Sequence, residues 1–284
     1  MRPVNTLFVA RALIAVLAVV ALGLAGLSFL PAPALRSLVR TWLSLATPYG
    51  RTTVRPDPPP TILAPRGPLP TGPGGVLEWA QSAGAPYEPR GCGFFLRLSS
   101  GAVIGVTTAH SVGDLGDPAN MVERFAFGIA NKEGYLATFD TLYGSPGVPR
   151  TGDDLTVDFV LLRPDSPVDA SLVLTPDPRG APQPGERVSL FSGLGDSTGA
   201  PPVPAGTVQS VSATAVWVLM DGSVYPGGMS GSPLVSQYTG QVVGMAIATM
   251  PRGSQYMIGF HPIGSIVQKA GEALEFPKIA DYQR

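Results

Sequence analysis

The sequence predicts an all-β fold, of the sandwich or barrel class, for the part of the chain after residue 75. Short runs rich in valine and aromatic residues alternate with turns as far as about residue 260, a pattern typical of antiparallel strands. The 35 glycines and 31 prolines agree with such a turn-rich fold. No long stretch of helical periodicity interrupts the series. The expected strands include residues 93–98, 102–107, 124–129, 159–163, 187–191, 215–220, 233–236 and 242–248.

Helical spacing is expected at both ends of this strand-rich region. Residues 76–83 fit a short helix, and residues 263–274 fit a helix that closes the domain. The predicted organisation is an N-terminal segment at 1–47, a linker at 48–75, a domain at 76–276 and a tail at 277–284.

The N-terminal segment predicts contact with a membrane. Residues 12–30 carry no charge, and this length approaches the roughly 20 residues of a spanning helix. An uncleaved anchor is favoured, although Ala32-Pro33-Ala34 would also suit a cleavable signal. Residues 35–46 have helical spacing, which fits either an interfacial helix or one packed on the domain. We expect a single-pass anchor with an extracytoplasmic domain; the alternative is secretion after cleavage.

The linker at 48–75 is rich in proline and includes Pro58-Pro59-Pro60. Such a stretch cannot pair into sheets and buries little surface, so it predicts an extended spacer.

The composition of the whole chain argues against several classes of function. A net charge of −1 gives no basic footprint for nucleic acid, and a single cysteine, Cys92, excludes an intramolecular disulfide. Two histidines and one cysteine in unrelated contexts do not make a metal site, so no metal and no cofactor are expected.

Three segments carry the residue types that a serine nucleophile requires. Such chemistry needs a hydroxyl, a base that takes its proton, a carboxylate that orients the base, and donors for the oxyanion. His110 follows an apolar strand, and Asp158 directly precedes another. Ser230 lies in the glycine-rich segment 226–234. We therefore expect His110, Asp158 and Ser230 to be catalytic.

The order of these residues argues against two other hydrolase folds. An α/β-hydrolase needs an acid between its serine and its histidine, and no acid lies between Ser230 and His261. The subtilisin order conflicts with the all-β pattern, because that enzyme has a parallel α/β fold. Asp153 and Asp154 are rival acids, but they are more typical of a solvated turn. The unbroken apolar run that follows Asp158 favours that residue.

These segments resemble those of the trypsin-like serine proteases of the chymotrypsin fold, in the V8-like and HtrA-like branch without a PDZ domain. The likeness covers roughly residues 88–270 and is carried by Gly105-Val106-Thr107-Thr108-Ala109-His110, by 158–162 and by 226–234. It implies two six-stranded antiparallel β-barrels, at about 88–165 and 183–262. The helical spacing near the C-terminus adds a closing helix to this expectation, and the uncharged run at 12–30 adds an N-terminal hydrophobic helix. It also implies an oxyanion hole made by the backbone N–H groups of Gly228 and Ser230.

Two positions depart from relatives in this resemblance. Cys92 stands where the V8-like and HtrA-like branches often carry serine. Met229 stands where digestive proteases have the aspartate that pairs with a freshly cut N-terminus. The second departure argues against that style of activation.

The same resemblance suggests a specificity pocket with an apolar or small lining. Its base would be Val224, six residues before Ser230. None of the candidates is a carboxylate that could pair with Arg or Lys, so cleavage after apolar or small residues is predicted. His261 is more typical of a packed histidine, although some glutamate-cleaving relatives use histidines here. The other candidate wall residues are Ile247, Ala248, Thr249, Ile258, Gly259 and Phe260.

The sequence therefore predicts a serine-type endopeptidase that hydrolyses proteins or peptides through an acyl-enzyme, with a membrane contact and no nucleic-acid partner. One alternative is a catalytically silent or inducible protease-fold module that binds or senses at the membrane; another is an esterase on the same fold. An active site needs His110 within hydrogen-bond reach of both Asp158 and Ser230. A collapsed loop at 227–230 would favour the silent module.

Overall fold

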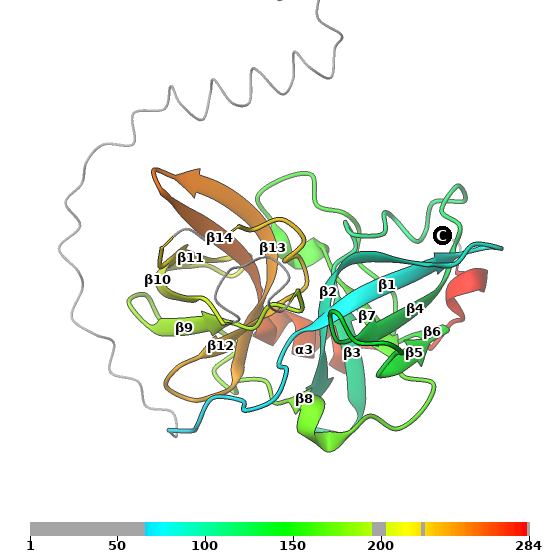
Figure 1. Ribbon diagram of the computed structural model, residues 1–284, viewed down its shortest axis with the longest axis horizontal. Helices are drawn as coiled ribbons and strands as arrows, with labels where there is room; N and C mark the ends of the chain where they lie inside the picture. Colours follow the sequence, from blue (N-terminus) through cyan, green and yellow to red (C-terminus); the bar gives the residue numbers. More distant parts are fainter. Residues whose placement is uncertain (1–65, 195–202, 223–224, 283–284) are drawn as a thin grey trace, which may run out of the picture. The chain divides into compact units, whose positions relative to one another are not determined.

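The computed structural model describes residues 66–194, 203–222 and 225–282, which form two antiparallel β-barrels lying side by side (Figure 1). Helix α3 (Ile263–Gly271) packs against strands of the second barrel and contributes to the core between the barrels. The predicted all-β, chymotrypsin-like fold with a C-terminal helix is confirmed. The expected N-terminal hydrophobic helix lies outside the described residues. Within the described part, no helix is long and apolar enough to cross a membrane.

The first barrel is formed by a sheet whose two outermost strands, β5 and β6, follow each other directly in the sequence. Its strand order is β5-β4-β1-β2-β3-β7-β6, and β8 joins β2 in parallel. Only Asp140 separates β5 from β6, so one continuous segment pairs with β4 on one side and with β7 on the other. This segment closes the sheet. The strands are β1 (Val76–Ser82), β2 (Tyr87–Arg97), β3 (Val103–Thr107), β4 (Val122–Gly128), β5 (Ala137–Phe139), β6 (Thr141–Leu142), β7 (Val160–Arg163) and β8 (Val173–Leu174).

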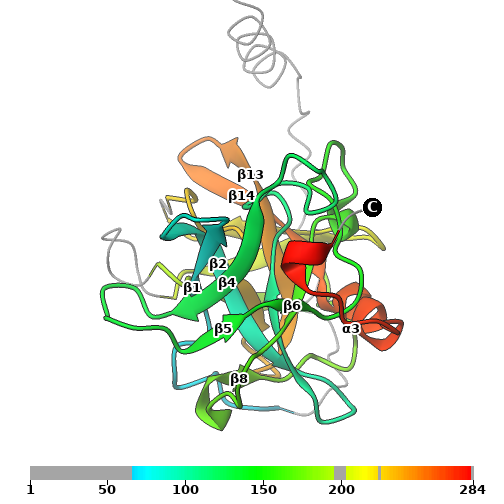
Figure 2. The same ribbon diagram turned by 90° about the vertical axis from the view of Figure 1, so that its right-hand side faces the viewer.

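The second barrel is closed in the order β10-β11-β14-β13-β12-β9. Its longest strands, β13 and β14, form a hairpin that extends past the rest of the barrel (Figure 1). Figure 2 shows the first barrel nearest the viewer, with α3 at its side. The strands are β9 (Arg187–Leu190), β10 (Ala205–Val211), β11 (Val216–Met220), β12 (Pro233–Ser236), β13 (Val242–Arg252) and β14 (Gln255–Pro262).

Strand β2 explains how the barrels are joined. Residues 91–96 are buried on both faces, although an antiparallel strand often exposes one. Phe95 points into the core of the first barrel. Phe94 and Leu96 join a second cluster, which includes Val242 and Met245 of the second barrel. This shared cluster also includes Val106 of β3 and Phe159, which directly follows Asp158.

One sequence expectation was wrong: residues 76–83 do not form a helix. Strand β1 occupies Val76–Ser82 and pairs with both β2 and β4. Val76, Glu78 and Ala80 are buried in alternation with partly exposed neighbours, which is the period of a strand. A window this short does not separate the two periods, so the tertiary pairing decides. As a result, β1 adds a strand to the first barrel before residue 88. The C-terminal helix also ends at Gly271 rather than near residue 274.

Candidate active site

The pairing of β3 with β7 brings His110 and Asp158 together. Thr107, the last residue of β3, lies opposite Val160, the first residue of β7. His110 follows the end of β3, and Asp158 precedes the start of β7. Because the two strands are antiparallel, both residues lie beyond the same end of the β3–β7 pair. Asp158 also ends the short 3₁₀ helix η1 (Leu155–Val157). The antiparallel register therefore places two segments 48 residues apart at one point.

His110 lies between the other two predicted catalytic residues. Its Nδ1 atom is 2.8 Å from Oδ2 of Asp158, and its Nε2 atom is 2.7 Å from Oγ of Ser230. The backbone N–H of His110 also donates to Oδ1 of Asp158 at 3.0 Å. The Asp158 side chain is fully buried, whereas the His110 side chain is 32% exposed. The imidazole can thus be reached from solvent while the carboxylate cannot.

The charge of Asp158 determines the tautomer of His110. Burial acts to raise the pKa of Asp158, but hydrogen bonds and charge from His110, with a further bond from the Arg150 backbone, outweigh it and hold the pKa below its usual value. An ionised carboxylate can only accept hydrogen bonds. Nδ1 of His110 must therefore carry a hydrogen, and in the neutral ring Nε2 is left to accept from the Ser230 hydroxyl.

The loop that carries Ser230 depends on glycine at two positions. Gly228 has a φ of 79° and Gly231 a φ of 89°, both in the left-handed region that side chains disfavour. At Gly231 an added Cβ would also lie only 1.8 Å from the carbonyl oxygen of Cys92. Any side chain at residue 231 would therefore push the loop away from β2.

Backbone donors in this loop alternate between bonded and open. The N–H of Met229 donates to Pro226, that of Gly231 to Ala246, and that of Ser232 to Met229. The N–H groups of Gly228 and Ser230 donate to no acceptor among the described residues. Two backbone donors, at Gly228 and at Ser230 itself, are therefore open to an external oxygen atom.

Cys92 holds residues 226–234, the predicted nucleophile loop, in a way that the sequence did not predict. Its backbone N–H donates to the carbonyl of Ser230 at 2.8 Å, and its thiol donates to the carbonyl of Gly228 at 3.2 Å. Burial raises the pKa of the Cys92 thiol to about 11, so it remains a neutral donor at ordinary pH. The unusual residue type at position 92 was the available signal, but only the docking of β2 on the loop reveals the contact.

Four of the predicted pocket residues have side chains buried in the core clusters. Ile258 and Phe260 belong to the core of the second barrel, and Ile247 and Ala248 belong to the cluster between the barrels. Leu155 and Trp217 fill the space beside Gly259. Thr249 is exposed, and Val224 lies outside the described residues.

His261 is a packed histidine. It is fully buried, and its ring contacts that of Phe159 with centroids 5.8 Å apart. Neither ring nitrogen has a hydrogen-bond partner among the described residues. Burial lowers the pKa of His261 to about 4, although the nearby Asp158 opposes the shift. A neutral, enclosed ring offers no charge to an anionic substrate.

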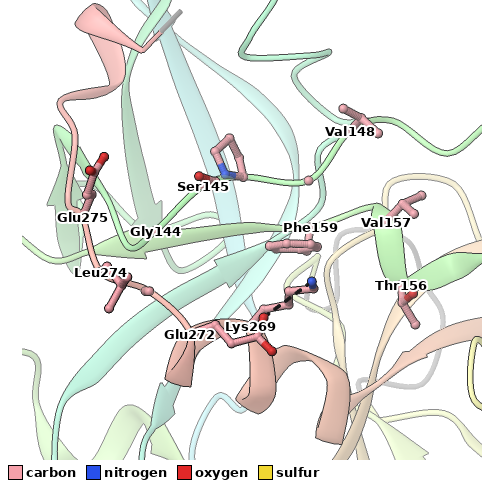
Figure 3. A pocket seen from close by; sticks show the side chains of 13 residues that line it. Gly144, Ser145, Val148, Thr156, Val157, Phe159, Lys269, Glu272, Leu274 and Glu275 are labelled. Atoms are coloured by element: carbon pink, nitrogen blue, oxygen red, sulfur yellow. Dashed lines mark ion pairs between the residues drawn. The ribbon is translucent and has the colours of Figure 1, made fainter. Parts of the chain in front are cut away.

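A cavity of about 650 Å³ is lined by Val157 and Phe159, the two neighbours of Asp158 in the sequence (Figure 3). Thr156, Val157 and Phe159 line one part of it, and Lys269 of α3 and Glu272, which directly follows α3, line another. Neither His110 nor Ser230 contributes to its lining. The cavity is therefore separate from the candidate catalytic residues. In the described part of the chain, no cluster of His, Cys, Asp and Glu is arranged to hold a metal ion.

Comparison with known proteins agrees with this architecture. Residues 91–245 match the family model of the trypsin-like peptidase domain, a span of more than half the chain. No curated protein matches the sequence significantly.

Similar solved structures include kallikrein-related peptidase 10, with 17% identity over 71% of this chain and 95% of that one, and a TM-score of 0.47. A scabies mite protease paralogue described as inactivated has 18% identity, with 72% and 94% coverage and a TM-score of 0.47. A glutamic acid specific serine protease, described as using a histidine triad in substrate binding, has 15% identity, with 70% and 96% coverage and a TM-score of 0.43. Likenesses this weak assign no function.

Proposed function

Because the chain belongs to the trypsin-like peptidase domain family, we propose that it is a serine endopeptidase in which His110, Asp158 and Ser230 form the catalytic triad. The observation that carries the proposal is the position of His110, whose two ring nitrogens lie 2.8 Å from Asp158 and 2.7 Å from Ser230. A silent module of the same fold would not need both contacts.

The first half of the reaction forms an acyl-enzyme. Oγ of Ser230 attacks the substrate carbonyl carbon while Nε2 of His110 takes the hydroxyl proton. The ionised Asp158 stabilises the imidazolium that results. As the tetrahedral intermediate collapses, His110 gives the proton to the leaving amine, and the peptide C–N bond breaks. The acyl group is then bonded to Ser230.

The open N–H groups of Gly228 and Ser230 would stabilise the oxyanion. Negative charge develops on the substrate oxygen only during the attack, so donors aimed at that point lower the barrier rather than merely bind substrate. Removing one such donor typically costs a factor of about 10² to 10³ in kcat. In the second half of the reaction, His110 activates a water molecule that hydrolyses the acyl-enzyme and restores the Ser230 hydroxyl.

The proposed specificity is for apolar or small residues before the cleaved bond. Its support is the lack of an acidic or basic side chain among the candidate pocket residues other than His261, which is buried and neutral. Cleavage of a peptide library would test it. Enrichment of apolar or small residues at that position is expected, and a strong preference for Glu, Arg or Lys would reject the proposal.

We also propose that residues 12–30 attach the enzyme to a membrane, with the catalytic domain outside the cytoplasm or, if the segment is cleaved, secreted. The support is the uncharged sequence of this segment. Full-length protein should stay with membranes after an alkaline wash, and a protease added outside intact cells should reach the catalytic domain. A soluble protein with an intact N-terminus would reject the anchor.

Labelling by a serine-directed fluorophosphonate tests the proposed catalytic function. Wild-type protein should label and hydrolyse peptides, and Ser230→Ala should do neither. Ser254→Ala, which changes an exposed serine in the β13–β14 turn, is the matched control and should label like the wild type. Folded wild-type protein that never labels would reject catalysis and favour the silent binding module.

A further inference from the structure

A buried carboxyl group lies behind the candidate active site and takes no part in the mechanism above. Glu78 lies on β1 at an irregularity in the pairing with β2, where such bulges redirect side chains. It is fully buried on a face of β1 shared with the apolar Val76 and Ala80. A buried acid is costly unless it has hydrogen-bond partners, so those partners indicate its role.

Glu78 contacts hydroxyl groups on both sides of His110. Oγ1 of Thr107 lies 2.7 Å from Oε2 of Glu78. Oγ of Ser111 lies 3.0 Å from Oε2 and 3.2 Å from Oε1. Thr107 ends β3 and Ser111 directly follows His110. The carboxyl group therefore joins both ends of the segment that carries the catalytic base.

The same carboxyl group is linked to the nucleophile loop through two residues. Oγ1 of Thr107 lies 2.8 Å from the carbonyl oxygen of Cys92. Cys92 in turn donates its N–H to Ser230 and its thiol to Gly228. An added Cβ at Gly91 would lie 3.1 Å from Oε2 of Glu78 and 3.2 Å from the carbonyl of Ser230. Glu78 and the carbonyl of Ser230 therefore both lie close to Gly91.

Counting hydrogens shows why the protonation of Glu78 matters. The Thr107 hydroxyl has one hydrogen but lies within bonding distance of two acceptors, Glu78 and the carbonyl of Cys92. An ionised Glu78 competes for that hydrogen. A protonated Glu78 donates its own hydrogen to Thr107, and the Thr107 hydroxyl can then donate to Cys92. The protonated state satisfies one more of these contacts.

The surroundings of Glu78 favour the protonated state. Burial raises the pKa of Glu78 to about 8, outweighing the hydroxyl hydrogen bonds and the charge of Arg90. Arg90 and Cys92 on β2 interact electrostatically with Glu78, and His110 directly precedes its hydrogen-bond partner Ser111. On β4 its paired residue is the apolar Phe127. Arg90 pairs with Glu88 on the surface and does not neutralise the buried acid.

We propose that Glu78 is a positioning residue for the nucleophile loop, acting as a hydrogen-bond donor to Thr107. The Thr107 hydroxyl is then free to hold the carbonyl of Cys92, and Cys92 holds Gly228 and Ser230. This inference rests on the function proposed above. When Glu78 ionises, the carbonyl of Cys92 loses its donor and the open N–H groups of the loop are less firmly aimed.

Two variants of Glu78 distinguish a hydrogen-bonding role of this side chain from a role in packing alone. Glu78→Gln keeps a donor for Thr107 and an acceptor for Ser111, whereas Glu78→Met has similar length and neither. The kcat and KM of peptide hydrolysis and the rate of fluorophosphonate labelling are measured in the full chain from about pH 6 to about pH 10, a window around the raised pKa. Wild-type kcat should decline as the pH rises through about 8.

Glu78→Gln should match the wild type at neutral pH within about twofold and lack this decline, because an amide does not ionise there. Glu78→Met should lose roughly tenfold to a hundredfold in kcat with little change in KM, as expected for misplaced catalytic groups. An infrared band of a protonated carboxylic acid, present at neutral pH in the wild type and lost in Glu78→Gln, would support the proton assignment without needing turnover.

The inference is overturned if wild type and Glu78→Gln decline alike with pH, or if Glu78→Met keeps wild-type kcat. If Glu78→Met does not fold, the comparison with Glu78→Gln decides alone. Labelling that depends on Ser230 but not on residue 78 would reject the positioning role and leave the proposed protease function standing. Wild-type protein that never labels would reject both.

Discussion

Asp158 binds both N–H groups of His110 that face it: the backbone N–H at 3.0 Å through Oδ1, and Nδ1 of the ring at 2.8 Å through Oδ2. One carboxylate therefore fixes the main chain and the side chain of His110, the proposed catalytic base, together. The ring has little freedom to turn away from Ser230, because rotation would break a charge-assisted hydrogen bond inside a buried pocket.

Asp158→Asn should lower kcat by a factor on the order of 10⁴ with little change in KM, because an amide favours the wrong histidine tautomer. The control is Asp154→Asn, which changes the exposed cap of η1 that makes no contact with His110. It should retain near wild-type kcat. Equal activity of both variants in peptide hydrolysis would remove Asp158 from the triad.

Cys92 should resist alkylation in the folded protein. It is fully buried, and its raised pKa keeps it protonated, whereas alkylation needs an exposed thiolate. As Cys92 is the single cysteine of the chain, thiol modification reports on one site. Iodoacetamide should react only when denaturant opens the structure, as measured by mass spectrometry. Rapid reaction under native conditions would mean that β2 does not cover the loop as described.

Glu78 should make the protein less stable as the pH rises. Burial raises the pKa of the Glu78 carboxyl from 4.5 to about 8, so the folded state binds the carboxyl proton more tightly than the unfolded state does. The resulting stabilisation is complete below pH 4.5 and is lost as the pH rises towards about 8. The contribution is roughly 1.4 kcal/mol per pH unit within that window. The free energy of unfolding, measured with urea at several pH values, should fall with pH more steeply in the wild type than in Glu78→Gln, by about this amount per pH unit. If the free energy of unfolding depends on pH in the same way in both proteins, the pKa of Glu78 is not raised by folding.

His261 should have the opposite effect at acid pH. Its pKa falls from 6.5 to about 4, so stability is lost as the pH drops through that range and the buried ring must take up a proton. His261→Leu should remove this dependence and change neutral stability by no more than about 1 kcal/mol, because the ring nitrogens have no partners to lose among the described residues. A large loss of stability at neutral pH would contradict this account.

Arg179 should be a major contributor to the stability of the second barrel. Its guanidinium bonds both Asp177 and Glu186, two buried carboxylates. Arg179→Met would leave these acids uncompensated and should cost about 3–5 kcal/mol in chemical unfolding. Arg187→Met is the control, because the exposed Arg187–Asp221 pair should contribute no more than about 1 kcal/mol. Similar losses in the two variants would contradict the difference in burial.

Much of this structure could be predicted from local sequence. Strand periodicity and turn residues predict most of the strands and the closing helix, because an alternating apolar pattern is a local property. The glycines around Ser230 and the apolar strand after Asp158 likewise mark the candidate site, since each motif is a short continuous segment. The specificity pocket stays a prediction, although the side chains of Ile258 and Phe260 lie in the core of the second barrel. Whether Ile258 and Phe260 face the barrel core or a cleft depends on strand register and bulges.

The sequence by itself determined the all-β class and the residue types of a serine triad with its glycine-rich loop. Only the tertiary structure decided that residues 76–82 are a strand, and that Glu78 on this strand reaches Thr107 and Ser111. The reason is physical: these contacts join residues about 30 positions apart through β-pairing, and no local periodicity encodes which strand a side chain will meet. His110 and Ser230, 120 residues apart, meet for the same reason, because docking of the two barrels brings them together.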